Sequence, residues 1–275
     1  MLDLATTLVF ASAAVHAGWN AAVKHTADPD AAIVGVVGGS VALSALLGFA
    51  LGETLPSAAS WPWVAASGAI EAVYFLSLTR ALSRLPLSTA YGIGRGGGQL
   101  VTWPLSVALQ GERPSGQGLL GAALVVAGLA IGIARPVARS GLAWALLCAF
   151  TVGLYPLTYR QALAAGAPPC TLFAISMAMA WPVQVAALGP TRSARIASAA
   201  RPITLALAAA GCTASFLFFL LALQLDHAGR ASALRNVSIV FATLLAAALG
   251  ERVGPRTLLG SVLIALGAAA LATSG

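Results

Sequence analysis

Ten apolar stretches, each about 20 residues long, run through this sequence, and short turns separate them. An α-helix rises 1.5 Å per residue, so about 20 apolar residues cross the roughly 30 Å hydrocarbon core of a bilayer. Proline, glycine and aspartate occupy the turns, where helices are expected to end. The sequence therefore predicts an all-α membrane protein with ten transmembrane helices, at residues 4–24, 31–51, 61–82, 86–109, 115–134, 141–161, 169–188, 203–224, 229–249 and 255–273.

The composition agrees with this prediction. Only 23 of the 275 residues are Asp, Glu, Lys or Arg, 59% are hydrophobic, and the mean hydropathy is +0.89, which a soluble domain with a wet surface could not sustain. The net charge of +7 is spread over the turns without a basic patch, so we expect membrane lipid and no nucleic acid as a partner. The three cysteines stand singly in apolar runs, so we expect no disulfide framework, no metal site and no cofactor.

A Gly-Glu-Arg turn followed by an apolar helix occurs at residues 111–113 and again 139 residues later, at residues 250–252. Self-similarity of this kind indicates an internal duplication, with repeats at residues 1–137 and 138–275. Because each repeat holds five helices, the second enters the bilayer upside down. Inverted repeats enclose a cavity near the midplane and open it alternately to each side. We interpret the two Glu-Arg turns themselves as structural, because their carboxylates lie at helix ends.

Three charged side chains lie near the middle of predicted helices, where a charge costs roughly 2.5–3.5 kcal/mol on insertion scales. They are Glu71, Arg95 and Arg235. Together they leave one positive charge uncompensated, which predicts a solute that carries a carboxylate, sulfonate or phosphonate. Alternatively, Glu71 and Arg95 form a buried ion pair between adjacent helices and serve folding alone.

Polar and aromatic side chains share helix faces with these charges. Tyr91, Arg95, Gln99 and Trp103 recur every four residues and so form one face. The five glycines around Arg95 indicate either close helix packing or a local break that lines a cavity. The predicted substrate-binding residues are Trp19, Asn20, Tyr74, Tyr91, Arg95, Gln99, Trp103, Tyr155, Tyr159, Arg235 and Asn236.

His16 and Glu71 are candidates for proton coupling, because burial disfavours the charged form of either side chain. Alternatively, His16 only forms a hydrogen bond to a neighbouring helix. Arg95 precedes its Gly-Glu-Arg turn by 16 residues and Arg235 precedes its own by 15. One residue turns a helix by about 100°, so we expect the two arginines to point in different directions relative to their repeats.

The order of these motifs resembles EamA-type members of the drug/metabolite transporter superfamily over essentially the whole chain. The resemblance rests on residues 16–20 (His-Ala-Gly-Trp-Asn) with Lys24, on Arg95-Gly96, and on residues 233–235 (Ala-Leu-Arg) with Ser238, the last two each before a Gly-Glu-Arg turn. It implies a secondary transporter of small organic metabolites, often an exporter of amino acids or related compounds. The chain departs from the family pattern at Gln99, where proline is common, and it has no counterpart of Glu71 near Cys212 and Thr213.

The orientation in the membrane is left open between two arguments. The odd-numbered turns hold ten basic residues and the even-numbered turns three, which places the odd turns in the cytoplasm and both termini outside. The resemblance implies cytoplasmic termini instead. Both arguments place the two termini on the same side.

We therefore predict a secondary active transporter of an anionic or zwitterionic, amino-acid-like metabolite, an exporter that works by alternating access in the bacterial inner membrane. The alternatives are an exporter of lipophilic cations, an intramembrane enzyme with His16 and Glu71 as acid and base, and a membrane scaffold that transports nothing. No nucleophile–base pair or metal cluster has a spacing suited to catalysis, so no catalytic residue is assigned and the chain is predicted not to be an enzyme. The sequence does not distinguish a monomer from a homodimer.

Overall fold

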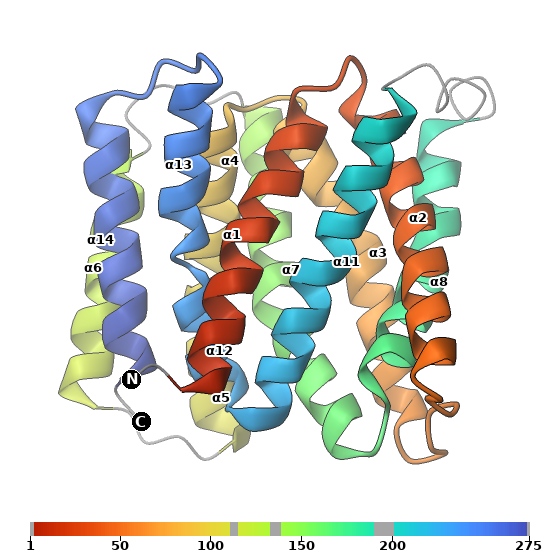
Figure 1. Ribbon diagram of the computed structural model, residues 1–275. Helices are drawn as coiled ribbons and strands as arrows, with labels where there is room; N and C mark the ends of the chain where they lie inside the picture. Colours follow the sequence, from red (N-terminus) through yellow and green to blue (C-terminus); the bar gives the residue numbers. More distant parts are fainter. Residues whose placement is uncertain (1–2, 111–114, 133–138, 190–200, 274–275) are drawn as a thin grey trace.

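The computed structural model describes residues 3–110, 115–132, 139–189 and 201–273, and every regular element in these ranges is a helix. The helices stand side by side and run nearly parallel or antiparallel (Figure 1). Their bounds are α1 Leu4–Lys24, α2 Pro29–Ala50, α3 Trp61–Leu82, α4 Leu87–Tyr91, the π-helix η1 Gly92–Gly96, α5 Gly97–Gln110, α6 Gly116–Gly132, α7 Arg139–Ala164, α8 Pro169–Leu188, α11 Pro202–Leu225, α12 Ala228–Arg235, α13 Ser238–Ala248 and α14 Pro255–Ala272.

Among the described residues, six helical segments are long and apolar enough to cross a membrane: α2, α7, α8, α11, α12 together with α13, and α14. Helix α6 is apolar but shorter. Helices α1 and α3 are less apolar because they carry polar side chains that are turned inward; Asn20 and Glu71 are both 0% exposed, whereas Phe49 is 86% exposed and Leu207 is 66% exposed. Polar groups inside and apolar groups outside are typical of a multi-pass membrane protein.

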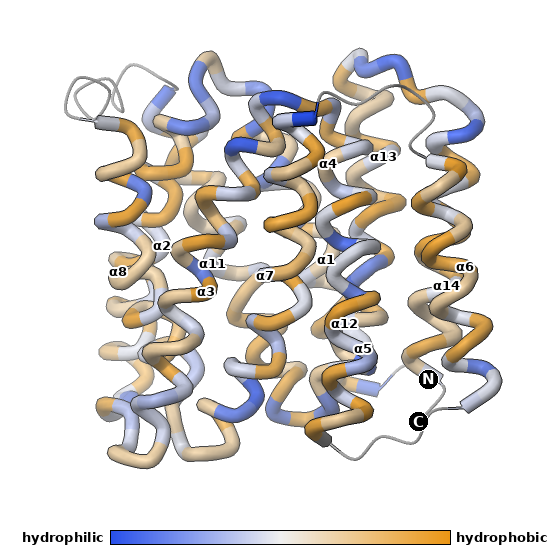
Figure 2. The backbone as a smooth tube through the Cα atoms, turned by 180° about the vertical axis from the view of Figure 1, so that it is seen from behind, coloured by the Kyte–Doolittle hydropathy of each residue, from blue (hydrophilic) through white to orange (hydrophobic). Residues whose placement is uncertain are grey.

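Hydrophilic segments gather at the two ends of the bundle (Figure 2). A further hydrophilic patch lies midway along the bundle, where α1, α5 and α12 approach one another (Figure 2). Among the buried polar side chains of these three helices are Asn20 on α1, Gln99 on α5 and Arg235 on α12.

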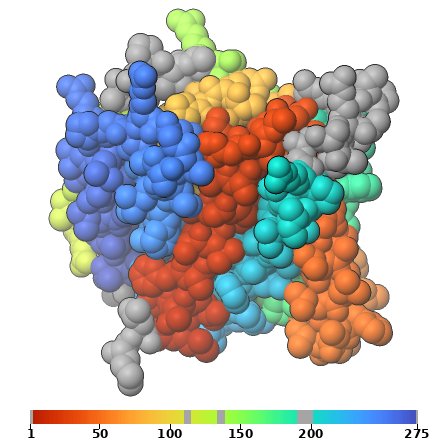
Figure 3. All heavy atoms as spheres, turned by 45° about the horizontal axis from the view of Figure 1, so that its top comes forward, coloured from red at the N-terminus to blue at the C-terminus, as the bar shows by residue number. Residues whose placement is uncertain are grey.

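The helices pair between the first and second halves of the chain. Helix α1 packs along α11, α3 along α7, α2 along α8, and α6 along α14. The α6–α14 pair stands at one edge of the bundle and the α2–α8 pair at the other (Figure 1). Figure 3 shows α1 between α13 on one side and α11 on the other. Helix α1 begins and α14 ends at the same end of the bundle (Figure 1).

The helix ends lie where the sequence places breakers. Helices α2, α8, α11 and α14 each begin with a proline, which has no N–H to leave unpaired in the first turn. Asp28 caps α2, since its Oδ1 accepts from the Ala31 N–H at 3.2 Å. Glu53 caps α8 through the backbone N–H of Cys170 and Thr171. Lys24 donates to the carbonyls of residues 82 and 85 at the end of α3.

Two predicted helices are interrupted, which corrects the spans 86–109 and 229–249. The first consists of α4, the π-helix η1 and α5. The glycines there also allow close packing, since a Cβ at Gly98 would lie 2.6 Å from Val152 Cγ1 on α7, so both interpretations of the glycine run hold. The second span breaks at Asn236 and Val237, where hydrogen bonds reach back three residues instead of four.

The turn at residues 250–252 forms hydrogen bonds to the start of α4 in the first half of the chain. Both carboxylate oxygens of Glu251 accept from the backbone N–H of Leu87, at 2.9 and 3.0 Å, at the start of α4. This confirms a structural role for the second Glu-Arg turn. The first copy, at residues 111–113, lies outside the described residues.

We expect Glu251→Ala to destabilise the protein by about 1–2 kcal/mol, because it leaves an N-terminal helix N–H without its acceptor. Thermal unfolding in detergent measures this loss. Arg252→Ala is the matched control, since the Arg252 side chain is exposed in the same turn. An equal loss from both variants would contradict the capping role.

Candidate functional site

Arg95 and Arg235 are both deeply buried, at 5% and 0% exposure. Each lies at the interruption of its span: Arg95 belongs to the π-helix η1, and Arg235 is the last residue of α12 before the break. π-turns in helices occur frequently at functional sites. The two interruptions therefore place one arginine from each half of the chain at the same depth.

The two arginines meet at Tyr155 on α7. Arg95 Nη1 donates to Tyr155 Oη at 2.9 Å, and Arg235 Nη1 donates to the same oxygen at 2.8 Å. The expected difference of about 100° concerns each arginine relative to its own repeat, so this shared contact between the repeats leaves it a prediction. We call Arg95 and Arg235 the arginine pair.

His16 on α1 stands between the two guanidinium groups. Its Nε2 lies 2.5 Å from Arg95 Nη2, and its Nδ1 lies 3.1 Å from Arg235 Nη2. A neutral imidazole offers one acceptor nitrogen and one N–H, whereas both arginines can only donate. One arginine therefore has no acceptor on His16 at any moment. An added anion can supply that acceptor, in competition with the Ser215 carbonyl oxygen, which lies 3.4 Å from Arg235 Nη2.

Aromatic side chains surround the arginine pair. Tyr74 Oη lies 3.4 Å from His16 Nε2, and Asn20 Nδ2 donates to Tyr91 Oη at 3.2 Å. Trp19 packs edge-on against His16, with ring centroids 5.1 Å apart. A small cavity opens beside them, lined by His16, Tyr74, Leu78, Ala90, Tyr91, Gly94, Arg95, Cys148 and Val152. The predicted residues Trp19, Asn20, Tyr74, Tyr91, Arg95, Tyr155 and Arg235 are thus brought together.

The structure adds residues from α11 that the sequence did not single out. The Arg235 guanidinium carbon lies 4.3 Å from the ring centroid of Phe219 and 5.2 Å from that of Phe216. The hydroxyl of Ser215 accepts from Trp19 Nε1 at 3.2 Å. The only signal for them in the sequence is the spacing of three between Phe216 and Phe219, which places both on one face of a helix.

Four predicted site residues lie away from the arginine contacts. Asn236 Nδ2 donates to Gln99 Oε1 at 3.3 Å, which joins the two interrupted spans. Trp103 is partly exposed and packs at the rim of the core. Tyr159 contacts Tyr155 by its ring, with centroids 6.0 Å apart.

Glu71 on α3 is 0% exposed and does not pair with Arg95. Among the described residues, no carboxylate forms an ion pair with either member of the arginine pair. The alternative of a Glu71–Arg95 ion pair is therefore wrong. The arginine pair keeps its two positive charges close together without a direct counterion in the described part of the chain.

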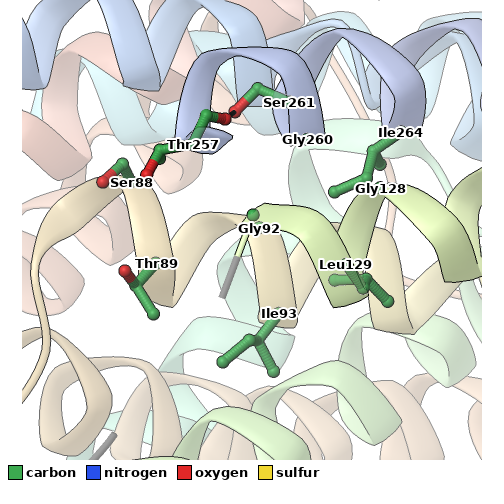
Figure 4. Close-up of a pocket in the computed structure, with 11 residues that line it drawn as sticks. Ser88, Thr89, Gly92, Ile93, Gly128, Leu129, Thr257, Gly260, Ser261 and Ile264 are labelled. Carbon is green, nitrogen blue, oxygen red and sulfur yellow. Dashed lines mark hydrogen bonds between the residues drawn. The ribbon is translucent and has the colours of Figure 1, made fainter. Parts of the chain in front are cut away.

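A second pocket lies apart from the arginine pair, between α4, η1, α6 and α14 (Figure 4). Hydroxyls of Ser88, Thr89, Thr257 and Ser261 line it together with glycines. In the ranges that the structure describes, no three His, Cys, Asp or Glu side chains gather as metal ligands would.

Comparisons with known proteins identify the family and the fold. The sequence model of the EamA-like transporter family matches residues 139–273. A solved structure described only as "Crystal structure of protein" has the same fold, with a TM-score of 0.71 at 20% identity, over 97% of this chain and 95% of that one. No curated protein sequence matches this chain. Through residues 139–273, the chain belongs to the EamA-like transporter family, within the drug/metabolite transporter superfamily.

Proposed function

We propose that the chain is a secondary active transporter with ten transmembrane helices in two inverted repeats, residues 1–137 and 138–275. The helix pairs support this, because each pair remains a pair when the two repeats are interchanged. Helix α1 packs on α11 as its counterpart α7 packs on α3, while α2 and α6 each pack on their own counterparts, α8 and α14. The family match at residues 139–273 coincides with the second repeat. Rocking of such repeats exposes a central site alternately to each side.

The substrate in this proposal is a small anionic or zwitterionic metabolite, similar to an amino acid. The observation that carries it is the arginine pair, two buried guanidinium groups that share one hydroxyl and have no carboxylate bound to them among the described residues. Even with Glu71 ionised, one positive charge is left over. Guanidinium groups bind carboxylates with two parallel hydrogen bonds, and the surrounding rings suit the organic part of the solute.

The remaining parts of the proposal follow from the family and from charge. Export of amino-acid-like compounds across the bacterial inner membrane follows from the resemblance to EamA-type transporters, and His16 or Glu71 is the candidate for proton coupling. An intramembrane enzyme is disfavoured, because the family consists of transporters. Export of lipophilic cations is disfavoured by the two guanidinium groups at the site.

Purified protein in liposomes tests this proposal with amino acids, organic acids, phosphonates and cationic dyes. We expect protein-dependent movement of carboxylates, amino acids or phosphonates, and none of the dyes, because a cation would meet the arginine pair. Liposomes without protein are the control. Transport of lipophilic cations alone would overturn the anionic substrate.

A further inference from the structure

A second group of buried polar side chains lies beside the arginine pair. Glu71 on α3, Tyr159 on α7 and Ser176 on α8 are each 0% exposed. Within the described chain, neither carboxylate oxygen of Glu71 forms a hydrogen bond, and the hydroxyls of Tyr159 and Ser176 form none either. The Tyr159 hydroxyl interacts with both of its neighbours, although neither contact has the geometry of a hydrogen bond. We call these three side chains the Glu71 cluster.

An ionised carboxylate without hydrogen bonds is costly to bury, and the cost falls when it takes up a proton. A protonated carboxyl group is also a donor, which the Glu71 cluster can use because hydroxyl oxygens accept. Burial without hydrogen bonds therefore favours a protonated Glu71, whose carboxyl group can donate to the Tyr159 hydroxyl oxygen.

The groups that face Glu71 also allow the ionised form. Arg95 from η1 and Arg235 from α12 both attract its carboxylate electrostatically. Tyr159 and Cys148 from α7 and Cys212 from α11 are the other titratable groups that interact with it, and α8 contributes the hydroxyl of Ser176. Burial opposes the negative charge of Glu71 and the two cations favour it, so its proton affinity depends on the charges placed beside it.

His16 is less suited to hold an exchangeable proton. Both of its ring nitrogens already face a guanidinium group, at 2.5 Å and 3.1 Å. A proton added to the imidazole would bring a third positive charge into contact with two others. Glu71 instead offers a negative charge that a proton neutralises.

We propose that the Glu71 cluster is a proton-binding site and that its proton crosses the membrane together with the anion held by the arginine pair. This inference rests on the proposed function, because its second half requires an anion at the arginines. An ionised Glu71 compensates one of the two arginines and so competes with the anion. Protonation of Glu71 removes that competition, and by linkage a bound anion strengthens proton binding to the same extent. Proton and anion therefore move in the same direction, so in the proposed export the outward gradient of the anion, and not an inward proton gradient, drives the movement.

A metal cation fits the Glu71 cluster less well than a proton. Hard cations such as Ca²⁺ take roughly six to eight oxygen ligands. The side chains of the Glu71 cluster offer four oxygens, from the carboxylate and the two hydroxyls. A proton needs a single acceptor.

Infrared difference spectra of the protein in detergent, recorded between acidic and alkaline pH, test the proton site without any substrate. We expect a band of a buried protonated carboxyl group that is lost in Glu71→Gln and shifted in Tyr159→Phe. Glu53→Gln is the matched control and should retain the band, because Glu53 caps α8 at the end of the bundle. A wild-type band that survives in Glu71→Gln would overturn the proton site.

Proton uptake on anion binding tests the coupling. Benzenesulfonate is the probe, because a sulfonate stays ionised and cannot carry the proton itself. In weakly buffered solution with a pH indicator, we expect up to one proton to be taken up per anion bound by the wild-type protein. Glu71→Gln should bind the anion without proton uptake and with little dependence on pH. Binding that requires Na⁺ and not protons would overturn the proposal in favour of a sodium site.

The two experiments separate the two proposals. Anion binding without proton uptake in the wild-type protein contradicts the coupling and leaves the anionic substrate intact. The infrared band without any anion binding contradicts the proposed substrate and leaves the proton site intact. Folding of Glu71→Gln is checked by size-exclusion elution at the wild-type position, and Tyr159→Phe provides the independent variant.

Discussion

Replacing Arg235 with glutamine is expected to abolish anion transport while the protein stays folded. A charge-assisted hydrogen bond contributes about 1.5–3 kcal/mol, so loss of even one such bond to the substrate weakens binding roughly 10- to 150-fold. The folded state should tolerate the change, because Arg235 and Arg95 both donate to Tyr155 and their like charges repel each other in the empty protein. We therefore expect the thermal stability of Arg235→Gln to equal or exceed that of the wild type.

The measurements are uptake into proteoliposomes and thermal unfolding in detergent, made on the same preparations. Arg84→Gln is the matched control, because it removes one positive charge from an exposed position at the end of α3. The transport rate of Arg235→Lys should lie between the rates of Arg235→Gln and Arg84→Gln, since lysine keeps the charge and loses the bidentate geometry of arginine. Wild-type transport by Arg235→Gln would contradict the anionic substrate site. A loss of stability in parallel with transport would make the arginine a structural residue.

The helices and the deep charges could be predicted from sequence because each has a local signal. Proline at the first turn sets the start of α2, α8, α11 and α14, and apolar length sets their extent. Glu71, Arg95 and Arg235 are conspicuous because charges are rare within apolar runs. Neither signal requires knowledge of which helices touch.

The contacts of the site could not be predicted, because they depend on how the helices are rotated about their axes. Helix α11 is apolar nearly throughout, so no polar face indicates that Phe216 and Phe219 turn toward Arg235. The break at Asn236 and Val237 contains neither glycine nor proline. Glu71 and Arg95 lie on consecutive predicted helices, yet the structure turns Arg95 toward Tyr155 and His16 instead.

Replacing Gly128 with alanine is expected to destabilise the protein strongly at the crossing of α6 and α14. A Cβ at Gly128 would lie 2.7 Å from the carbonyl oxygen of Gly260 and 2.8 Å from a side-chain carbon of Ile264, and the first contact is to backbone that cannot rotate away. Figure 4 shows these residues facing one another. Forced separation of packed elements costs about 1–3 kcal/mol or more. The midpoint of thermal unfolding in detergent should fall accordingly.

Gly132→Ala on the same helix is the control for this effect. A Cβ at Gly132 meets its nearest neighbour, the Gly260 Cα, at 3.6 Å, which is an ordinary contact. Alanine is intrinsically favoured over glycine in a helix, so Gly132→Ala should be neutral or slightly stabilising, and the sign of the effect separates close packing from helix propensity. Because α14 also contacts α12 and η1, the two elements that carry the arginine pair, Gly128→Ala should reduce transport as well as stability. Full stability in Gly128→Ala would mean that α6 and α14 do not need their glycine contact.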